Sequence, residues 1–261
     1  TLINTTLSPA TLVGGGWRIP FFLGGVFGLV AMYLRRWLHE TPVFQQMQAR
    51  KALSEALPLR RVLQHHKRAV VISMLLTWLL SACIVVVILM APALMQKQHG
   101  LSAALTLQAN SLATVMLLLG CIIYGLLADR FGAARTLIGG SLLLALCSWL
   151  FFTSAASSVT ALFVTYAAAG LSVGVVGVVP FVMVRAFPAA IRFSGISFSY
   201  NLSYAIFGGL TPICVTLMMT LTPLAPALYV LALAIIGLLL GVWLKRDRDG
   251  APFAQRADIC G

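Results

Sequence analysis

Long apolar stretches alternate with short polar ones along this chain. Seven of them approach the ~20 residues that a helix needs to cross a bilayer, and they run over Trp17–Leu34, Ala69–Met95, Leu101–Leu127, Thr136–Phe152, Val159–Val184, Gly195–Leu221 and Ala225–Leu244. Only helices and closed barrels satisfy the backbone inside lipid, and the roughly ten-residue alternation of barrel strands is absent. The pattern predicts an all-α polytopic membrane protein with seven transmembrane helices.

The composition excludes a water-soluble globule. Of the 261 residues, 60% are hydrophobic and 9% are charged, and the mean hydropathy is +0.98. The net charge of +12 raises the question of a nucleic-acid partner. Such a partner needs a solvated basic face, whereas these basic residues stand at the ends of apolar stretches. We therefore expect the lipid bilayer, and no nucleic acid, as a partner.

The basic residues also predict an orientation. Of the 18 lysines and arginines, only Arg18 and Lys97 fall on one side of the predicted bilayer, and the other sixteen fall on the opposite side. Basic loops stay in the cytoplasm. We expect a multi-pass protein of the inner (plasma) membrane with its C-terminus cytoplasmic and the N-terminal end of this sequence outside. An odd number of spans that starts outside would follow an odd number of earlier helices, if both ends of the protein are cytoplasmic.

The same pattern divides the chain into four segments: an extracellular segment with the first helix (1–34), a basic cytoplasmic connecting loop (35–68), a six-helix bundle (69–244) and a cytoplasmic tail (245–261). The loop is interpreted as solvated, with an amphipathic stretch on anionic lipid left open. Its paired His65 and His66 have no carboxylate or thiol nearby, and the five cysteines are isolated. No metal site, disulfide framework or cofactor is expected.

A short motif with glycines and charged residues lies at the end of the third span and the start of the fourth. In the run GLLADRFGAAR, Gly125 would let another helix approach and Gly132 would permit a tight reversal. Asp129 can face a helix N-terminus or an arginine, while Arg130 and Arg135 keep the loop in the cytoplasm. The run resembles the loop motif G-x-x-x-D-R-x-G-R-R of the major facilitator superfamily, which joins the second and third helices of each six-helix half. The resemblance implies a gating loop.

Two further stretches of the sequence resemble one particular family within this superfamily. GWRIPF at 16–21 with ETPVF at 40–44 is similar to the sixth helix and following loop of the metabolite:proton symporter family. FPAAIRFSGISFSYN at 187–201, with FGGLTP at 207–212, is similar to that family's connection between helices ten and eleven. In this alignment the seven spans are helices six to twelve, and the first five helices are missing.

The resemblance implies a function. Members of the superfamily hold substrate between two six-helix halves near the midplane and rock one half against the other. It implies a fragment of a secondary active transporter for proton-coupled uptake of a small organic acid or osmolyte across the bacterial inner membrane. The expected partners are a small polar metabolite, a proton and the missing N-terminal helices that complete the cavity. The chain alone is expected to transport nothing.

Polar residues inside the spans are few. All six acids lie in loops or tails, so we expect the proton-coupling carboxylate outside these spans. Spacings of four and three residues put Ser197, Asn201 and Tyr204 on one helical face. Interhelical hydrogen bonding is the open alternative for all of these groups. The predicted substrate-pathway residues are Thr77, Trp78, Asn110, Ser197, Asn201 and Tyr204.

Glycine spacing predicts close helix packing in two spans. Gly170 and Gly174 in the fifth span, and Gly237 and Gly241 in the seventh, follow the small-xxx-small pattern of helix contacts. The glycine run that ends at Pro180 would also let the fifth span bend.

Two other classes of membrane protein fit the sequence less well. A seven-helix receptor or retinal-type protein would share the span count and the outside N-terminus, but a retinal protein needs a lysine in its last helix and Ala225–Leu244 has none. An intramembrane enzyme would carry a Gly-x-Ser-Gly serine with a histidine, paired membrane aspartates or His-Glu-x-x-His, and none of these occurs. No enzymatic activity is expected.

Overall fold

The computed structural model describes residues 14–37 and 58–250, and every regular element within them is a helix. The chain divides into two units, residues 1–54 and 55–261, which are described separately. The first unit contains the short 3₁₀ turn η1 (Gly16–Arg18) and helix α3 (Ile19–Arg35). The described apolar side chains of α3 are exposed, with Phe22 at 73% and Phe27 at 71%. Such a helix is suited to lipid or to packing against further helices.

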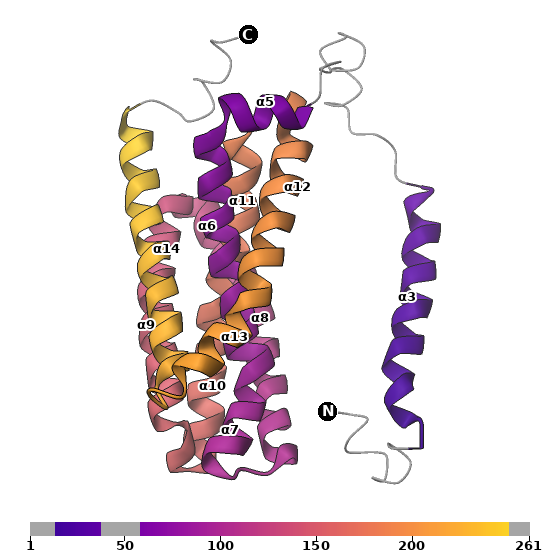
Figure 1. Cartoon of the computed structure of the whole chain (residues 1–261), viewed down its shortest axis with the longest axis vertical. Coiled ribbons are helices and arrows are strands. Elements are labelled where there is room, and N and C mark those ends of the chain that lie inside the picture. The colour runs from indigo at the N-terminus through magenta and orange to yellow at the C-terminus, as the bar shows by residue number, and fades with distance from the viewer. Residues whose placement is uncertain (1–13, 38–57, 251–261) are drawn as a thin grey trace. The chain divides into compact units, whose positions relative to one another are not determined.

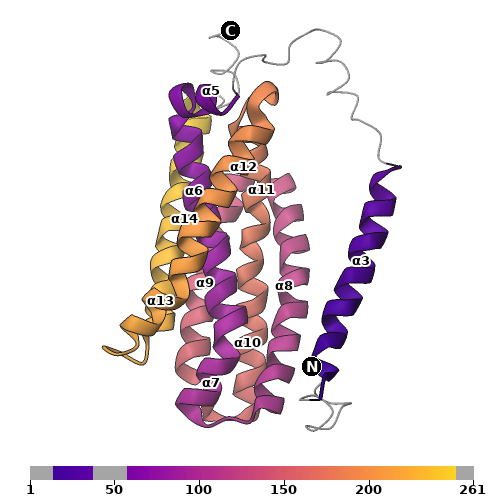
Figure 2. The same cartoon turned by 45° about the vertical axis from the view of Figure 1, so that its right-hand side comes forward.

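The second unit is a bundle of long helices joined by short connections (Figures 1 and 2). Its elements are α5 (Pro58–His65), α6 (Lys67–Cys83), η2 (Ile84–Met90), α7 (Ala91–His99), α8 (Ala103–Phe131), α9 (Ala133–Ser154), η3 (Ala155–Ser157), α10 (Val159–Val173), η4 (Gly174–Gly177), α11 (Val178–Ala186), η5 (Ala189–Ile191), α12 (Arg192–Ser203), η6 (Tyr204–Gly208), α13 (Gly209–Met218) and α14 (Ala225–Gly250).

The predicted all-α membrane architecture is confirmed. Six continuous helices are long and apolar enough to cross a membrane, and Phe21–Arg35 is a shorter apolar helix. Two details differ from the predicted segments. The predicted basic loop contains α5, which Figure 1 shows lying across one end of the bundle, and α14 continues to Gly250. α5 turns Val62 inward, where it is fully buried with Phe187 and Ile191.

Local sequence explains where several helices begin and end. Ser102 and Ser158 cap α8 and α10, because their hydroxyls accept hydrogen bonds from the backbone N–H groups of Leu105 and Ala161. Gly132 joins α8 to α9 with φ of 89°, a left-handed backbone that favours glycine. The tight reversal predicted at Gly132 is therefore present.

Three of the long helices change their winding partway along. η2 and η6 are π-helical segments, and η4 is a 3₁₀ segment at the predicted glycine run. Such segments break the regular α-helical hydrogen-bond ladder and frequently lie at functional sites.

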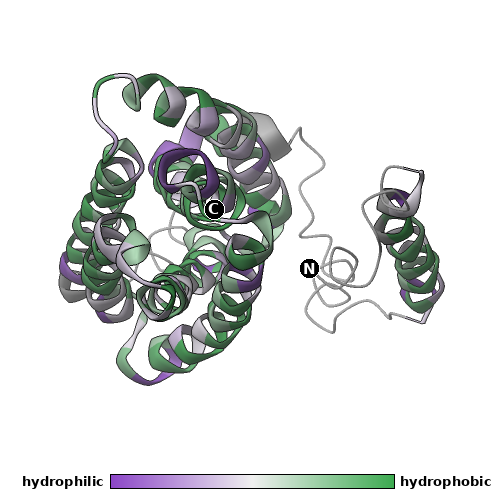
Figure 3. Ribbon diagram, turned by 90° about the horizontal axis from the view of Figure 1, so that it is seen from below, coloured by the Kyte–Doolittle hydropathy of each residue, from purple (hydrophilic) through white to green (hydrophobic). Residues whose placement is uncertain are grey.

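Two of the helices form the centre of the bundle. In the apolar stretches of Lys67–His99 and Val159–Ala186, 61% of the residues are buried, against 17–39% in the other four. Of the surrounding helices, α8 and α9 pack on α10, α12 packs on α6, and α14 packs on α9 and α6. The ribbons are hydrophobic over most of their length in Figure 3, as expected for helices that face one another and lipid.

Glycines allow the closest helix contacts, as predicted for both pairs. A Cβ at Gly174 would run into the backbone of Gly120, so η4, which continues α10, and α8 touch backbone to backbone there. On α14, a Cβ at Gly241 would fall 2.7 Å from the side chain of Ile138 of α9. These contacts set how closely α8 approaches η4 and how closely α14 approaches α9.

Candidate functional site

Helices α6 and α12, which lie far apart in the sequence, form one polar and aromatic surface together with η6. Ser203 of α12 donates a hydrogen bond of 2.7 Å to the backbone carbonyl of Met74 in α6. One turn further, a Cβ at Gly208 would lie 3.8 Å from Cβ of Ser81. This contact brings together residues that we call the α6–α12 wall: Trp78, Ser81, Ser197, Tyr200, Asn201, Tyr204 and Phe207.

Hydrogen bonds join Trp78 of α6 to the backbone of η6. The indole Nε1 of Trp78 lies 3.2 Å from the hydroxyl of Tyr229, which lies 3.1 Å from Oγ1 of Thr211. An indole nitrogen only donates, and Thr211 gives its single proton to the carbonyl of Phe207. The Tyr229 hydroxyl must therefore accept from Trp78 and donate to Thr211, so the direction of each bond is fixed.

The two ends of this hydrogen-bond chain also meet directly. The ring of Trp78 stacks on that of Phe207, with centroids 4.3 Å apart and planes inclined by 14°. Stacked aromatic pairs contribute ~0.5–1.5 kcal/mol beyond the area they bury. Stacking and hydrogen bonding together make a closed loop through α6, η6, α13 and α14. The loop holds both rings in one orientation.

The predicted stripe of Ser197, Asn201 and Tyr204 lies on α12 and the start of η6. Asn201 is exposed and donates through Nδ2 to the carbonyl of Ser197 at 2.8 Å. The ring of Tyr204 lies 5.2 Å from that of Tyr200 and rests against Gly208, whose missing Cβ leaves it room. Through Tyr204 the stripe is therefore in contact with the aromatic side chains of the α6–α12 wall.

Thr77 does not share this surface. It is fully buried and donates to the backbone carbonyl of Ser73 at 2.8 Å, with the sulfur of Met183 3.7 Å away. This geometry favours the alternative of helix packing for Thr77 over a place in the substrate pathway.

Asn110 lies in a separate cluster between α8, α10 and η2. The hydroxyl of Tyr166 is 2.6 Å from Oδ1 of Asn110 and 2.8 Å from the carbonyl of Val87. One proton cannot serve two acceptors, but turning the Asn110 amide so that Nδ2 donates to the hydroxyl satisfies all three groups. Tyr166 is only 1% exposed and stacks on Phe151, and Asn110 is half-buried, so the bond between them lies mostly inside the bundle. This geometry favours interhelical bonding for Asn110.

Charged residues lie at the ends of the second unit. Among the residues whose side chains the structure describes, Asp129 is the one acid, and it follows α8's apolar stretch. At the opposite end of the bundle stand Lys97 and His99. The basic residues at the end that carries α5 are Lys67, Arg68, Arg130, Arg135, Arg185, Arg192, Lys245 and Arg246.

The predicted gating loop has one feature that differs from expectation. A Cβ at Gly125 would meet no atom within 4 Å in the described part of the chain, so the close helix approach lies at Gly120 instead, against Leu171 and Gly174. The difference arises because α10 crosses α8 about one turn nearer its middle.

The charged members of the gating loop are exposed. Asp129, Arg130 and Arg135 all face outward, and within the described ranges Asp129 forms no ion pair. The guanidinium of Arg130 lies 5.4 Å from the ring centroid of Phe131. These side chains are available to contact a partner surface.

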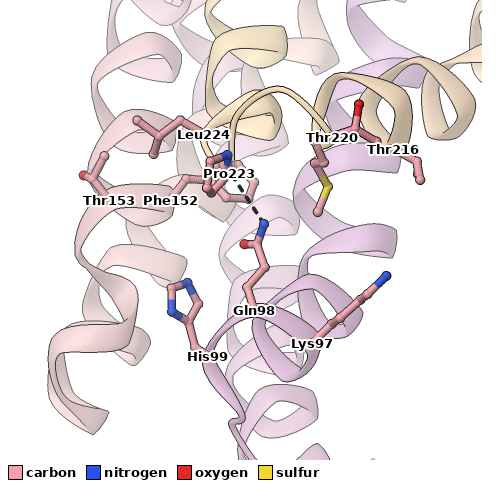
Figure 4. Close-up of a pocket in the computed structure, with 10 residues that line it drawn as sticks. Lys97, Gln98, His99, Phe152, Thr153, Thr216, Thr220, Pro223 and Leu224 are labelled. Atoms are coloured by element: carbon pink, nitrogen blue, oxygen red, sulfur yellow. Dashed lines mark hydrogen bonds between the residues drawn. The ribbon is translucent and has the colours of Figure 1, made fainter.

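Two cavities lie away from the wall. One, of about 700 Å³, opens between the end of α7, the end of α9 and the turn after α13 (Figure 4). Gln98 crosses it to donate a 3.4 Å hydrogen bond to the carbonyl of Pro223, while Lys97 and His99 diverge on either side. The other, of about 480 Å³, is an apolar groove between α8 and α9 with Arg135 at its edge.

Sequence reasoning missed three members of the wall's hydrogen-bonded loop: Phe207, Thr211 and Tyr229. Phe207 and Thr211 are four residues apart and so share a helical face, which is a weak signal. Tyr229 is a lone polar group near the start of the last apolar span. Nothing in the sequence pairs it with Trp78, 151 positions away.

The chain is similar in sequence and in fold to known membrane transporters. Residues 1–212 match the family described as Major Facilitator Superfamily. In fold, the chain is similar to the inward open conformation of the xylose transporter XylE from E. coli, with a TM-score of 0.54 and 18% sequence identity over 70% of this chain and 48% of that one.

Curated relatives carry more specific names. The glycine betaine/proline/ectoine/pipecolic acid transporter OusA of Dickeya dadantii is 27% identical over 95% of this chain and 52% of its own length. The ectoine/proline transporter ProP of Corynebacterium glutamicum is 29% identical over 83% and 45%. The citrate-proton symporter of Klebsiella pneumoniae is 28% identical over 94% and 55%. The chain thus spans about half the length of the curated relatives it matches.

Proposed function

Because this chain belongs to the Major Facilitator Superfamily, we propose that it forms one side of the solute cavity of a secondary active transporter. The transporter takes up a small organic acid or osmolyte with protons across the bacterial inner membrane. The chain is a multi-pass membrane protein related to osmolyte and citrate transporters and is not an enzyme. The family match removes the seven-helix receptor as an alternative.

The α6–α12 wall is the observation that carries this proposal. It is the surface of the second unit where predicted pathway residues from two helices gather, with Trp78 on one and Asn201 and Tyr204 on the other. It offers an amide, hydroxyls and ring faces, and these suit a small polar organic solute better than they suit lipid. The π-helical η6 lies within it, as is frequent at functional sites.

We propose that the residue which binds the coupling proton lies outside the described spans. Uptake driven by protons needs a group that binds and releases them, and intramembrane carboxylates are the usual choice. The one acid with a described side chain, Asp129, is exposed at a helix end. The coupling carboxylate therefore belongs to helices that complete the cavity, which in our proposal are the five missing N-terminal ones.

We also propose that the gating loop affects the equilibrium between the inward-open and outward-open states of the transporter. Asp129 and the flanking arginines project from the α8–α9 turn at the end of the bundle that we propose to be cytoplasmic. A charged loop that contacts the other half only in one state biases the equilibrium toward that state. In a complete transporter, Asp129→Asn is expected to slow turnover more than it lowers expression.

Uptake in cells tests the proposal. The chain is expressed in a bacterium that lacks its own uptake of betaine, proline, ectoine and citrate, alone or with the five N-terminal helices of OusA as a second polypeptide. We expect uptake of at least one labelled solute only when both pieces are present, and its loss when a protonophore collapses the proton gradient.

Membrane insertion of the chain is checked by its recovery from washed membranes. Uptake by the chain alone would contradict the shared cavity, and uptake that persists with the protonophore would contradict proton coupling. If the two inserted pieces co-purify yet transport none of the four solutes, the proposed transport function is wrong.

A further inference from the structure

Four aromatic rings gather on the α6–α12 wall, and this clustering goes beyond what a polar pathway requires. Trp78 and Phe207 stack at 4.3 Å, and Tyr200 and Tyr204 lie 5.2 Å apart on the same helix as Phe207. All four side chains are half-buried, so each ring keeps part of its surface accessible. A core cluster would bury them, as it does Phe151 and Tyr166 in the same bundle.

The rings are held in place. The hydrogen bonds from Trp78 through Tyr229 and Thr211 to the Phe207 carbonyl hold the stacked rings of Trp78 and Phe207 in place. Gly208 leaves the space that the Tyr204 ring occupies, since a Cβ there would lie 3.2 Å from its Cδ1. A ligand that meets these faces therefore meets a pre-ordered surface, and ordering the rings costs little on binding.

The wall contains no charged residue. Between Arg68 and Lys97 on the first helix, and between Arg192 and Met218 on the second, the described residues include no acid, lysine, arginine or histidine. A tricarboxylate would find no counter-charge on this surface. A cation without hydrogen-bond donors needs none, because the negative faces of aromatic rings attract it, above all when water is excluded.

We propose that the aromatic faces of the α6–α12 wall bind the quaternary ammonium centre of a zwitterionic solute in preference to a tricarboxylate. This inference rests on the proposed function and narrows its solute class. Among the solutes named for relatives it selects glycine betaine over citrate.

A pair of isosteres isolates the charge. Glycine betaine and 3,3-dimethylbutanoate have the same shape and the same carboxylate, but only the first carries a positive centre. We expect the purified full chain in lipid nanodiscs to bind labelled glycine betaine about tenfold more tightly than 3,3-dimethylbutanoate, since a desolvated cation–π contact is of that order. Citrate should not compete. Equal affinity for the two isosteres, or no binding of betaine, overturns the proposal.

Substitutions locate the effect. Phe207→Leu should remove most of the tenfold preference, whereas Phe207→Tyr should keep it. Phe193→Leu, an 85% exposed position on the same helix, is the matched control and should change nothing. Because Phe207→Leu could disturb the stack, fluorinated phenylalanines at position 207 provide a second series: affinity for betaine should fall stepwise with fluorine number while affinity for 3,3-dimethylbutanoate stays constant. A flat series contradicts the proposal.

The outcomes separate this inference from the function on which it rests. Proton-dependent uptake of citrate with no effect of ring fluorination would leave the transporter intact and reject the aromatic site. Absence of uptake of every solute by the inserted two-piece protein would reject the transporter itself.

Discussion

The hydroxyl of Tyr229 links two side chains that no sequence spacing connects, Trp78 and Thr211. Its position in the middle of the chain of bonds means that its removal leaves a donor on one side and an acceptor on the other. The ring would remain in place, since it packs against the core of the bundle. A single oxygen atom thus controls how firmly the wall's stacked pair is held.

Tyr229→Phe should lower the free energy of unfolding by about 1 kcal/mol, the usual cost of losing hydrogen bonds between membrane helices. Thermal unfolding of the purified chain in detergent measures this. Tyr33→Phe on α3, where the side chain is 59% exposed, is the control and should leave the transition unchanged. An unchanged transition in Tyr229→Phe would mean that the loop of bonds carries no stability.

Asn201→Ala and Tyr204→Phe test the proposed solute contacts. In the two-piece transporter both should raise the apparent KM several-fold, because each removes a hydrogen bond worth ~1 kcal/mol to the solute and little packing volume. Uptake at varied solute concentration and quantified membrane protein give the two readings. Loss of folded protein in proportion to lost uptake would identify the stripe as interhelical bonding instead.

Single residues show both the reach and the limit of sequence reasoning. Spacing placed Ser197, Asn201 and Tyr204 on one face, because helical periodicity is a local property. It could not separate Thr77, which points into the core, from its neighbour Trp78. Nor could it find Tyr229, because its role depends on how α14 packs against α6, and packing is decided across the whole bundle.

At the scale of elements, the crossing of α8 with the helix formed by α10 and η4 depends on glycine. The backbone of Gly174 lies against that of Gly120, so no side chain fits between them. Hydropathy predicted both helices to within a few residues. It could not predict the winding changes at η2 and η6, since a π-helical turn has the same apolar composition as the α-helix around it.

Gly174→Ala should destabilise the bundle by more than about 1 kcal/mol, because its new methyl group would overlap backbone atoms that cannot move independently. Gly139→Ala is the matched control: a Cβ there meets nothing within 4 Å. That substitution should be neutral or stabilise by up to ~1 kcal/mol through helix propensity. Thermal unfolding of both variants checks the pair, and equal effects would contradict the crossing.

At the scale of the whole molecule, charge defines an inside and an outside. Helix after helix returns its basic residues to the same end of the second unit, as the starts of α6 and α12 and the end of α14 illustrate. The positive-inside rule assigns this end to the cytoplasm. This orientation is a proposal that also fixes which end the gating loop occupies.

Ala156→Cys and Ala189→Cys, introduced singly after removal of the native cysteines, test that orientation. Both positions are exposed, in η3 and η5 at opposite ends of the bundle. In intact cells a membrane-impermeant maleimide should label Ala156→Cys only, and lysis should make Ala189→Cys reactive. The reverse pattern would invert the topology and move the gating loop outside.

The π-helical segment η6 also has a genetic meaning. A π turn holds one residue more than an α turn, so deleting one codon, that of Ala205 for example, would let the helix continue as regular α. The span of 30 residues would still cross the bilayer. The α turn that remains makes the same rotation with one residue fewer, so everything after the deletion would keep its orientation relative to α12, and Thr211 would still face Tyr229. This helix can therefore lose one codon at η6 and still present the same residues of α13 to α14, whereas the same loss from regular α-helix would turn everything after it by about 100°.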